Sequence, residues 1–125
     1  MRFSILVLDD QVQYGRSLDR ALRGEYEIVL SVSQAEAREK LTPDICIILA
    51  DVCLNESDAT DRKGLEFVSW VRTQRPDLPI ISMSAMDDES LESAALKAGA
   101  TKFLRKPIAI SRLKALLQEL VTRKH

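Results

Sequence analysis

Five polar residues of this sequence lie where short apolar runs end. The acidic pair Asp9-Asp10 follows the run FSILVL, and Asp51 follows the run ICIILA. Ser84 follows IISM, and Lys106 closes the segment KFLRK. Three carboxylates, a hydroxyl and an ammonium are the groups that metal-assisted chemistry on an anionic substrate requires, provided that the fold brings them together.

Clustered carboxylates repel one another unless a cation lies among them. Ligation by oxygen atoms alone suits Mg²⁺, for which Mn²⁺ could substitute. A metal ion and Lys106 together would neutralise an incoming phosphoryl group, and one carboxylate could then attack it to form an acyl phosphate. The Ser84 hydroxyl could hydrogen-bond the phosphoryl oxygens.

Apolar runs and amphipathic stretches alternate along the chain, which predicts five strands, each followed by a helix. The expected strands are 3–8, 26–30, 45–50, 78–83 and 102–104, and the expected helices lie near 14–22, 33–41, 65–72, 91–98 and 110–121. Gly24 and Gly99 are expected to end helices, and Ser33 with Glu36 forms a capping box. The run at 45–50 does not alternate, which is typical of a strand buried on both faces.

This alternation predicts an α/β fold, a doubly wound parallel sheet of five strands with helices on both faces. Ligands of such sheets bind outside the carboxyl ends of the strands. The five polar residues above are therefore expected to meet at one edge of the sheet.

Composition narrows the class of protein. The chain has 125 residues, of which 46% are hydrophobic and 30% charged, and its net charge is -1. We expect a single domain over residues 1–125, with an extended polar loop at about 55–63. The charge balance argues against direct nucleic-acid binding, and no segment is long and apolar enough to span a membrane. The spacing of Cys46 and Cys53 does not favour a zinc or redox motif, and we expect a cytoplasmic protein.

The segments LVLDDQ, ILADVCL, IISMSAM and GATKFLRKP, taken in this order, resemble the receiver domain of bacterial two-component response regulators. The resemblance covers essentially the whole chain. It implies a flavodoxin-like sheet with strand order 2-1-3-4-5. It also implies that a sensor histidine kinase or phosphotransfer protein donates a phosphoryl group, and that the domain acts on itself rather than as a turnover enzyme.

The resemblance also assigns roles to single residues. Asp51 is similar to the phosphorylated aspartate, and Lys106 to the lysine that pairs with the phosphoryl group. Asp10, Asp51, the backbone carbonyl of Cys53 and, largely through water, Asp9 would hold Mg²⁺. Ser84 and Phe103 occupy the places of the family's switch residues. Pro107 suggests a cis peptide bond. An effector domain or protein would contact the face formed by 91–98, 102–104 and 110–121.

The sequence departs from the family in the segment after Asp51. Asn55 stands where a proline is usual, and Gly64, which should open the next helix, comes late. The extra residues could form a lid, a partner contact or a tolerated surface insertion. Cys53 and Met86 orient water poorly, so we hypothesise a persistent phosphoryl group. Its loss within seconds without a phosphatase would contradict this hypothesis.

Simpler interpretations exist for each residue alone. Asp9, Asp10 and Asp51 could be helix caps, and Lys106 a solvated surface residue. Two other functions are also compatible with parts of the pattern. One is a phosphohydrolase or phosphotransferase, although such enzymes often use an Asp-x-Asp motif. The other is a binding module that is never phosphorylated, against which the complete set of acid, hydroxyl and lysine argues.

Overall fold

Five parallel strands form one sheet in the order β2-β1-β3-β4-β5. The computed structural model describes residues 2–55, 57–58 and 60–124. The strands are β1 (Phe3–Leu8), β2 (Tyr26–Ser31), β3 (Ile45–Asp51), β4 (Ile80–Ser84) and β5 (Lys102–Arg105). The helices are α1 (Val12–Leu22), α2 (Gln34–Lys40), α3 (Lys63–Gln74), α4 (Ser90–Ala98) and α5 (Ile110–Lys124). The predicted fold class, strand order and alternation of elements are confirmed.

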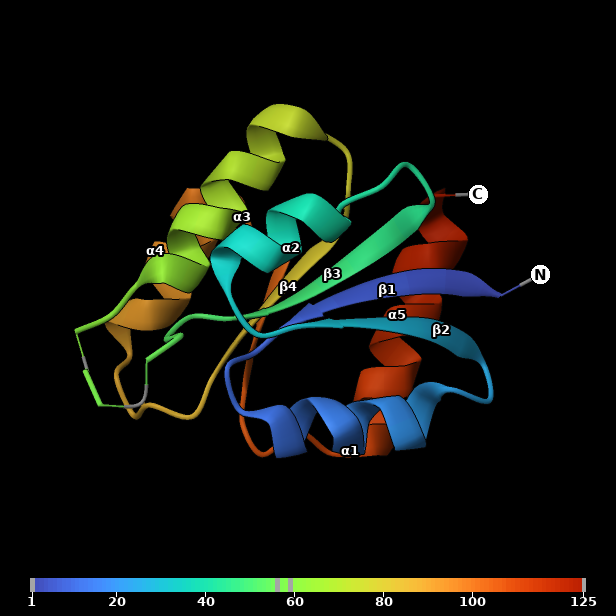
Figure 1. The fold of residues 1–125 in the computed structure, drawn as a ribbon, viewed down its shortest axis with the longest axis horizontal. Helices are drawn as coiled ribbons and strands as arrows, with labels where there is room; N and C mark the ends of the chain where they lie inside the picture. Colours follow the sequence, from blue (N-terminus) through green and yellow to red (C-terminus); the bar gives the residue numbers. More distant parts are fainter. Residues whose placement is uncertain (1, 56, 59, 125) are drawn as a thin grey trace.

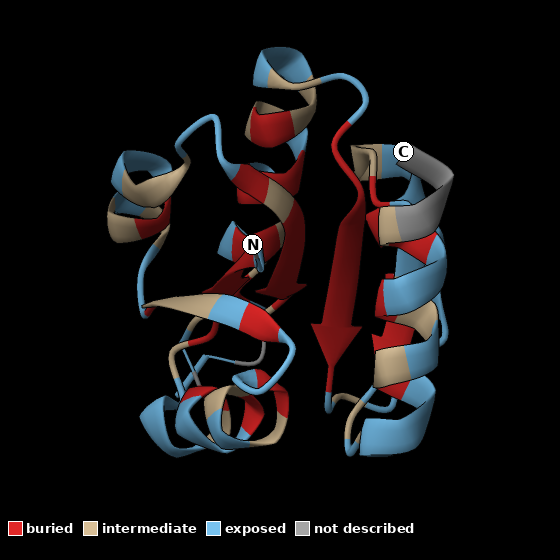
Figure 2. Cartoon of the chain, turned by 90° about the vertical axis from the view of Figure 1, so that its right-hand side faces the viewer, coloured by how far each residue is buried: buried red, intermediate tan, exposed pale blue. Residues whose placement is uncertain are grey.

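The helices cover both faces of the sheet (Figure 1). Helices α1 and α5 lie on one face, and α2, α3 and α4 lie on the other. Alternate residues of each strand enter opposite cores: Ile5 and Val7 pack with α1 and α5, whereas Leu6 and Leu8 pack with α2 and α3. Figure 2 shows buried strands in the middle of the fold: the central strands β1, β3 and β4 are almost entirely buried, whereas the edge strands β2 and β5 are partly exposed. No helix in the described part of the chain is long and apolar enough to cross a membrane.

The predicted helix ends are largely confirmed. The Ser33 hydroxyl accepts a hydrogen bond from the Glu36 backbone amide at 3.1 Å. In a capping box the Glu36 carboxylate would accept from the amide of Ser33 itself. Here it accepts instead from the amide of the preceding residue, Val32. Gly99 ends α4 with a φ of 120°, a conformation that favours glycine.

Several predicted boundaries are shifted by one to three residues, and two of these shifts adjoin the ends of β4 and α3. Strand β4 begins at Ile80 rather than at residue 78, since Pro79 has no N–H to donate to a neighbouring strand. Helix α3 begins at Lys63, so the predicted 55–63 loop is one residue too long at that end. Glu56 and Ala59 of that loop lie outside the described residues.

Candidate functional site

The predicted polar residues meet at the carboxyl edge of the sheet. Asp9 and Asp10 directly follow β1, Asp51 and Ser84 are the last residues of β3 and β4, and Lys106 directly follows β5. Because these strands are parallel neighbours, their carboxyl ends lie at the same edge. The parallel sheet therefore brings together residues that are far apart in the sequence.

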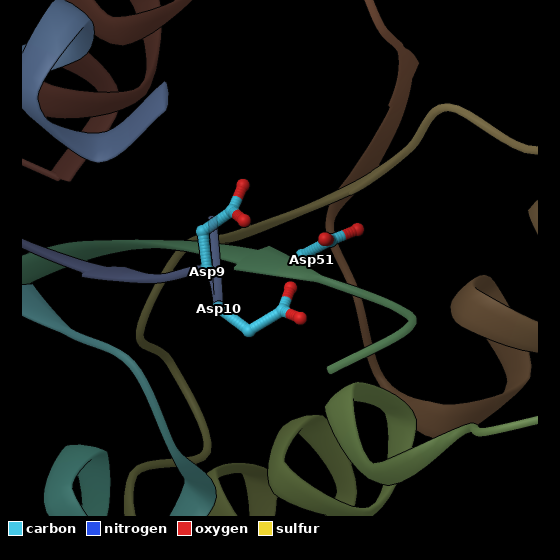
Figure 3. Close-up of side chains that lie close together, drawn as sticks. All are labelled: Asp9, Asp10 and Asp51. Atoms are coloured by element: carbon cyan, nitrogen blue, oxygen red, sulfur yellow. The ribbon is translucent and has the colours of Figure 1, made fainter. Parts of the chain in front are cut away.

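Three carboxylates form a tight cluster at this edge. Asp9, Asp10 and Asp51 each offer an oxygen atom, and these atoms all lie within 4.8 Å of one another. Figure 3 shows the three side chains gathered at the ends of β1 and β3. A set made only of carboxylate oxygens is suited to a hard divalent cation such as Mg²⁺ or Mn²⁺.

Asp9 differs from the other two acids because both of its carboxylate oxygens accept hydrogen bonds from the protein. Its Oδ1 accepts from the Gln11 amide at 2.9 Å, and its Oδ2 accepts from the Lys106 ammonium at 2.5 Å. Asp9 is also absent from the lining of the adjacent pocket, whereas Asp10 and Asp51 line it. These contacts leave Asp10 and Asp51 as the acids better placed to meet a ligand directly.

Lys106 joins the acidic cluster to β5. Its Nζ lies 3.3 Å from the Asp51 Oδ2 as well as 2.5 Å from Asp9, and its side chain is only 7% exposed. Burial alone would lower the pKa of Lys106, but the hydrogen bonds and charges of Asp9 and Asp51 outweigh burial and raise it. The ammonium therefore stays charged. The predicted cis peptide between Lys106 and Pro107 is present.

The pKa of Asp51 is shifted upward. Burial raises its pKa to about 7 in the metal-free protein. Lys106 opposes this shift, whereas the negative charges of Asp9 and Asp10 add to it. The shift shows that the charged form of Asp51 is disfavoured here, first by burial and then by the neighbouring carboxylates, and a cation bound to the cluster would favour the charged form.

A pocket of about 160 Å³ opens beside Asp51. The lining residues are Asp10, Gln11, Asp51, Cys53, Ser84, Ala85, Met86 and Lys106. Ser84 is buried, and its hydroxyl accepts a hydrogen bond from the Met86 amide at 3.0 Å. The Cys53 thiol donates to the carbonyl oxygens of Asn55 at 3.1 Å and Asp58 at 3.5 Å. Five of the predicted site residues, Asp10, Asp51, Cys53, Ser84 and Lys106, thus surround one small space.

The start of α3 packs directly against the Asp51 backbone. Gly64 donates its amide to the Val52 carbonyl at 3.0 Å. A Cβ atom at Gly64 would lie 1.7 Å from the Asp51 carbonyl oxygen, which no side chain can tolerate. Glycine at this point therefore permits the close approach that holds the end of β3 in place.

Phe103 lies apart from the pocket beside Asp51. It is half-buried in β5 and packs against the core between the sheet and α3. It also lines a separate depression with Glu92 of α4 and Arg112 of α5. Its role as a switch stays a prediction.

Two residues of this region were not predicted. Tyr14, to which the sequence assigned no site role, lies with the centre of its ring 4.2 Å from the Lys106 Nζ. Asp61 is buried, and its carboxylate accepts from the amides of Leu54 at 2.7 Å and Lys63 at 3.1 Å. The position of Tyr14, one helical turn beyond Asp10, was the available signal. Asp61 stands in a uniformly polar segment, which carries no signal of burial.

Known proteins resemble this chain along almost its whole length. Residues 5–118 match the response regulator receiver domain family. The transcriptional regulatory protein ZraR of Klebsiella oxytoca is 31% identical over 92% of this chain and 25% of its own length. The response regulator MprA of Mycobacterium ulcerans is 35% identical over 98% of this chain and 52% of its own length. The chain thus spans a quarter to a half of these relatives.

Solved structures agree with this assignment at the level of the fold. A two-component response regulator from Clostridium difficile superposes with a TM-score of 0.87 at 21% identity, covering 99% of both chains. The BeF3-activated DrrB receiver domain gives a TM-score of 0.85 at 18% identity, covering 98% of this chain and 99% of that one. On the family match, this chain belongs to the response regulator receiver domain family.

Proposed function

We propose that Asp51 is the residue on which this receiver domain accepts its phosphoryl group. One observation supports this assignment above all others. Asp51 lies in a cluster with Asp9 and Asp10, and a buried ammonium, that of Lys106, lies 3.3 Å from its carboxylate. It also opens onto a pocket, so a phosphoryl donor can approach it.

In the proposed reaction, a carboxylate oxygen of Asp51 attacks the phosphorus atom of a phosphohistidine on a partner protein. A P–O bond to Asp51 forms while the P–N bond to the histidine breaks, and the leaving nitrogen takes up a proton. Lys106 stays charged and turns from Asp9 toward the new phosphoryl oxygens. Ser84 supplies a hydroxyl to the same pocket.

The donor set of the cluster fits Mg²⁺, with Mn²⁺ as a substitute, because all of its side-chain ligands are oxygen atoms. Asp10, Asp51 and the Cys53 backbone carbonyl would hold the ion directly. Asp9 would act through water, since both of its oxygens already accept hydrogen bonds. When bound, the ion would neutralise charge on the phosphoryl oxygens.

The partners follow from this role. A sensor histidine kinase or a phosphotransfer protein is the proposed donor, which places the domain in the cytoplasm. The domain performs one transfer on itself and is not a turnover enzyme. Movement of Ser84 and Phe103 would shift the α4–β5–α5 face between two conformations. That face is the proposed contact for an effector domain or protein.

The test is incubation with Mg²⁺ and acetyl phosphate, followed by intact-protein mass measurement. The parent chain should gain the mass of one phosphoryl group, and Asp51→Asn should gain none. Asp19→Asn, which changes a carboxylate on α1 that pairs with Arg23, is the control and should behave like the parent. Sustained turnover of a small phosphate ester would instead favour a phosphohydrolase. Equal labelling of Asp51→Asn would refute the assignment.

A further inference from the structure

The Lys106 ammonium touches an aromatic ring as well as two carboxylates. Its Nζ lies 4.2 Å from the centre of the Tyr14 ring, well inside the roughly 6 Å range of a cation–π interaction. Tyr14 belongs to the first turn of α1, the helix that follows the acidic pair. The ring therefore approaches the site from the same connection that supplies Asp9 and Asp10.

These three neighbours define the position of an otherwise flexible side chain. Lysine carries its charge on four rotatable methylene groups, so an ammonium needs several partners to hold one position. Asp9 and Asp51 provide two oxygen acceptors, at 2.5 Å and 3.3 Å. The Tyr14 ring provides an attractive surface that carries no net charge.

We propose that Tyr14 is a positioning residue for Lys106 during phosphoryl uptake. The inference rests on the proposed function of Asp51. Because Lys106 is nearer to Asp9 than to Asp51, it has to turn away from Asp9 when phosphoryl oxygens arrive. The ring keeps one attractive contact with the ammonium while the carboxylate partners change. Loss of the ring leaves the ammonium held chiefly by Asp9.

A role for Tyr14 in core packing alone would require a different property of its side chain. Tyr14 is half-buried and packs against the core formed with α1 and α5. Packing of this kind is satisfied by any large apolar side chain, whereas attraction to a cation requires an aromatic face. Phenylalanine and leucine at residue 14 therefore separate the two roles.

The experiment compares Tyr14→Phe and Tyr14→Leu with the parent. The first-order rate of phosphorylation at saturating acetyl phosphate and Mg²⁺ should fall on the order of tenfold in Tyr14→Leu. It should stay within about threefold of the parent in Tyr14→Phe, since the ring is kept. Mg²⁺ affinity, measured by calorimetry, should be unchanged because Tyr14 is outside the acidic cluster.

A second measurement detects the contact between Lys106 and the ring of Tyr14 without any phosphorylation. In the NMR spectrum of the metal-free protein, the Lys106 side-chain protons nearest the ring should be shifted by its ring current in the parent and in Tyr14→Phe. This shift should vanish in Tyr14→Leu. Should Tyr14→Leu fail to fold, Tyr14→Met provides a second ring-free side chain.

The outcomes separate this inference from the proposed function. Equal rates for Tyr14→Leu and the parent, or an equally slow Tyr14→Phe, would overturn the role of Tyr14 and leave Asp51 as the acceptor. Absence of labelling in the parent would overturn the proposed function, and the inference that depends on it would fall with it.

Discussion

Each edge of the sheet holds a partly buried cation that donates to several protein oxygens, but the two cations have different partners. At the amino edge, the Arg72 guanidinium donates to backbone carbonyl oxygens of Gly99 at 2.6 Å and of Pro76 and Leu78 at 2.8 Å. At the carboxyl edge, the Lys106 ammonium donates to carboxylates of Asp9 and Asp51. The acceptors of Arg72 are backbone groups that do not ionise, whereas the acceptors of Lys106 are ionisable side chains.

This difference separates architecture from reactivity. Burial lowers the pKa of Arg72, and the nearby charge of Asp77 only partly opposes this. Its carbonyl partners do not ionise, so their charge does not change with pH. At the carboxyl edge, burial raises the pKa of Asp51 to about 7, and the charges of Asp9 and Asp10 add to this shift. A ligand that brings or removes charge can therefore change the interactions at this edge only.

The largest effect on folding is expected from Arg72→Met. This change leaves several carbonyl oxygens around α3, β4 and β5 without their charged donor, at a cost of about 2–3 kcal/mol in the free energy of unfolding. Urea denaturation would measure the loss, with Arg20→Met on the exposed face of α1 as the control. Phosphorylation per folded molecule should not change. A large loss of phosphoryl uptake in the folded variant would break the proposed division between the edges.

At the carboxyl edge, a substitution is expected to increase the free energy of unfolding rather than to lower it. Asp51→Asn should raise the stability of the metal-free protein by about 2 kcal/mol at pH 8, because it removes a charge that burial disfavours. The folded pKa of Asp51 lies above its unfolded value. The parent therefore loses stability as the pH rises from about 4 through about 7, and the variant does not show this loss.

Denaturation at pH 5 and pH 8, with and without Mg²⁺, would test this expectation. The gain should be much smaller at pH 5, where the parent's Asp51 is already protonated in the folded state. Mg²⁺ should stabilise the parent more than the variant, since binding to the folded state adds to stability. Equal stability of the two proteins at pH 8 would contradict the inference that the ionised form of Asp51 is disfavoured in the folded protein.

Much of this contrast was predictable because the carboxyl ends of parallel strands share one edge. The apolar runs located the strands. Because Asp9, Asp51 and Lys106 stand where these runs end, their meeting at one edge could be predicted. The position of Tyr14 one turn beyond Asp10 placed it near the acidic pair, but its contact with Lys106 was not predictable, because no local sequence pattern links the first helix to the residue after the last strand. Strand ends were also misplaced where a local rule intervened, as at Pro79.

The smallest effect is expected in the loop between β3 and α3, where a buried acid lies at the carboxyl edge but has fixed partners. The Asp61 carboxylate accepts from two backbone amides, so by the same reasoning it is structural. In Asp61→Asn one amide loses its acceptor, and the free energy of unfolding should fall by about 1 kcal/mol. The exposed Asp58→Asn should cost less.

Phosphorylation of Asp61→Asn by acetyl phosphate should stay within about twofold of the parent, since Asp61 is not among the pocket-lining residues. A larger change in rate would make the loop part of the reactive edge, because Arg62 next to it lies 4.0 Å from Asp88 in the connection that follows Ser84.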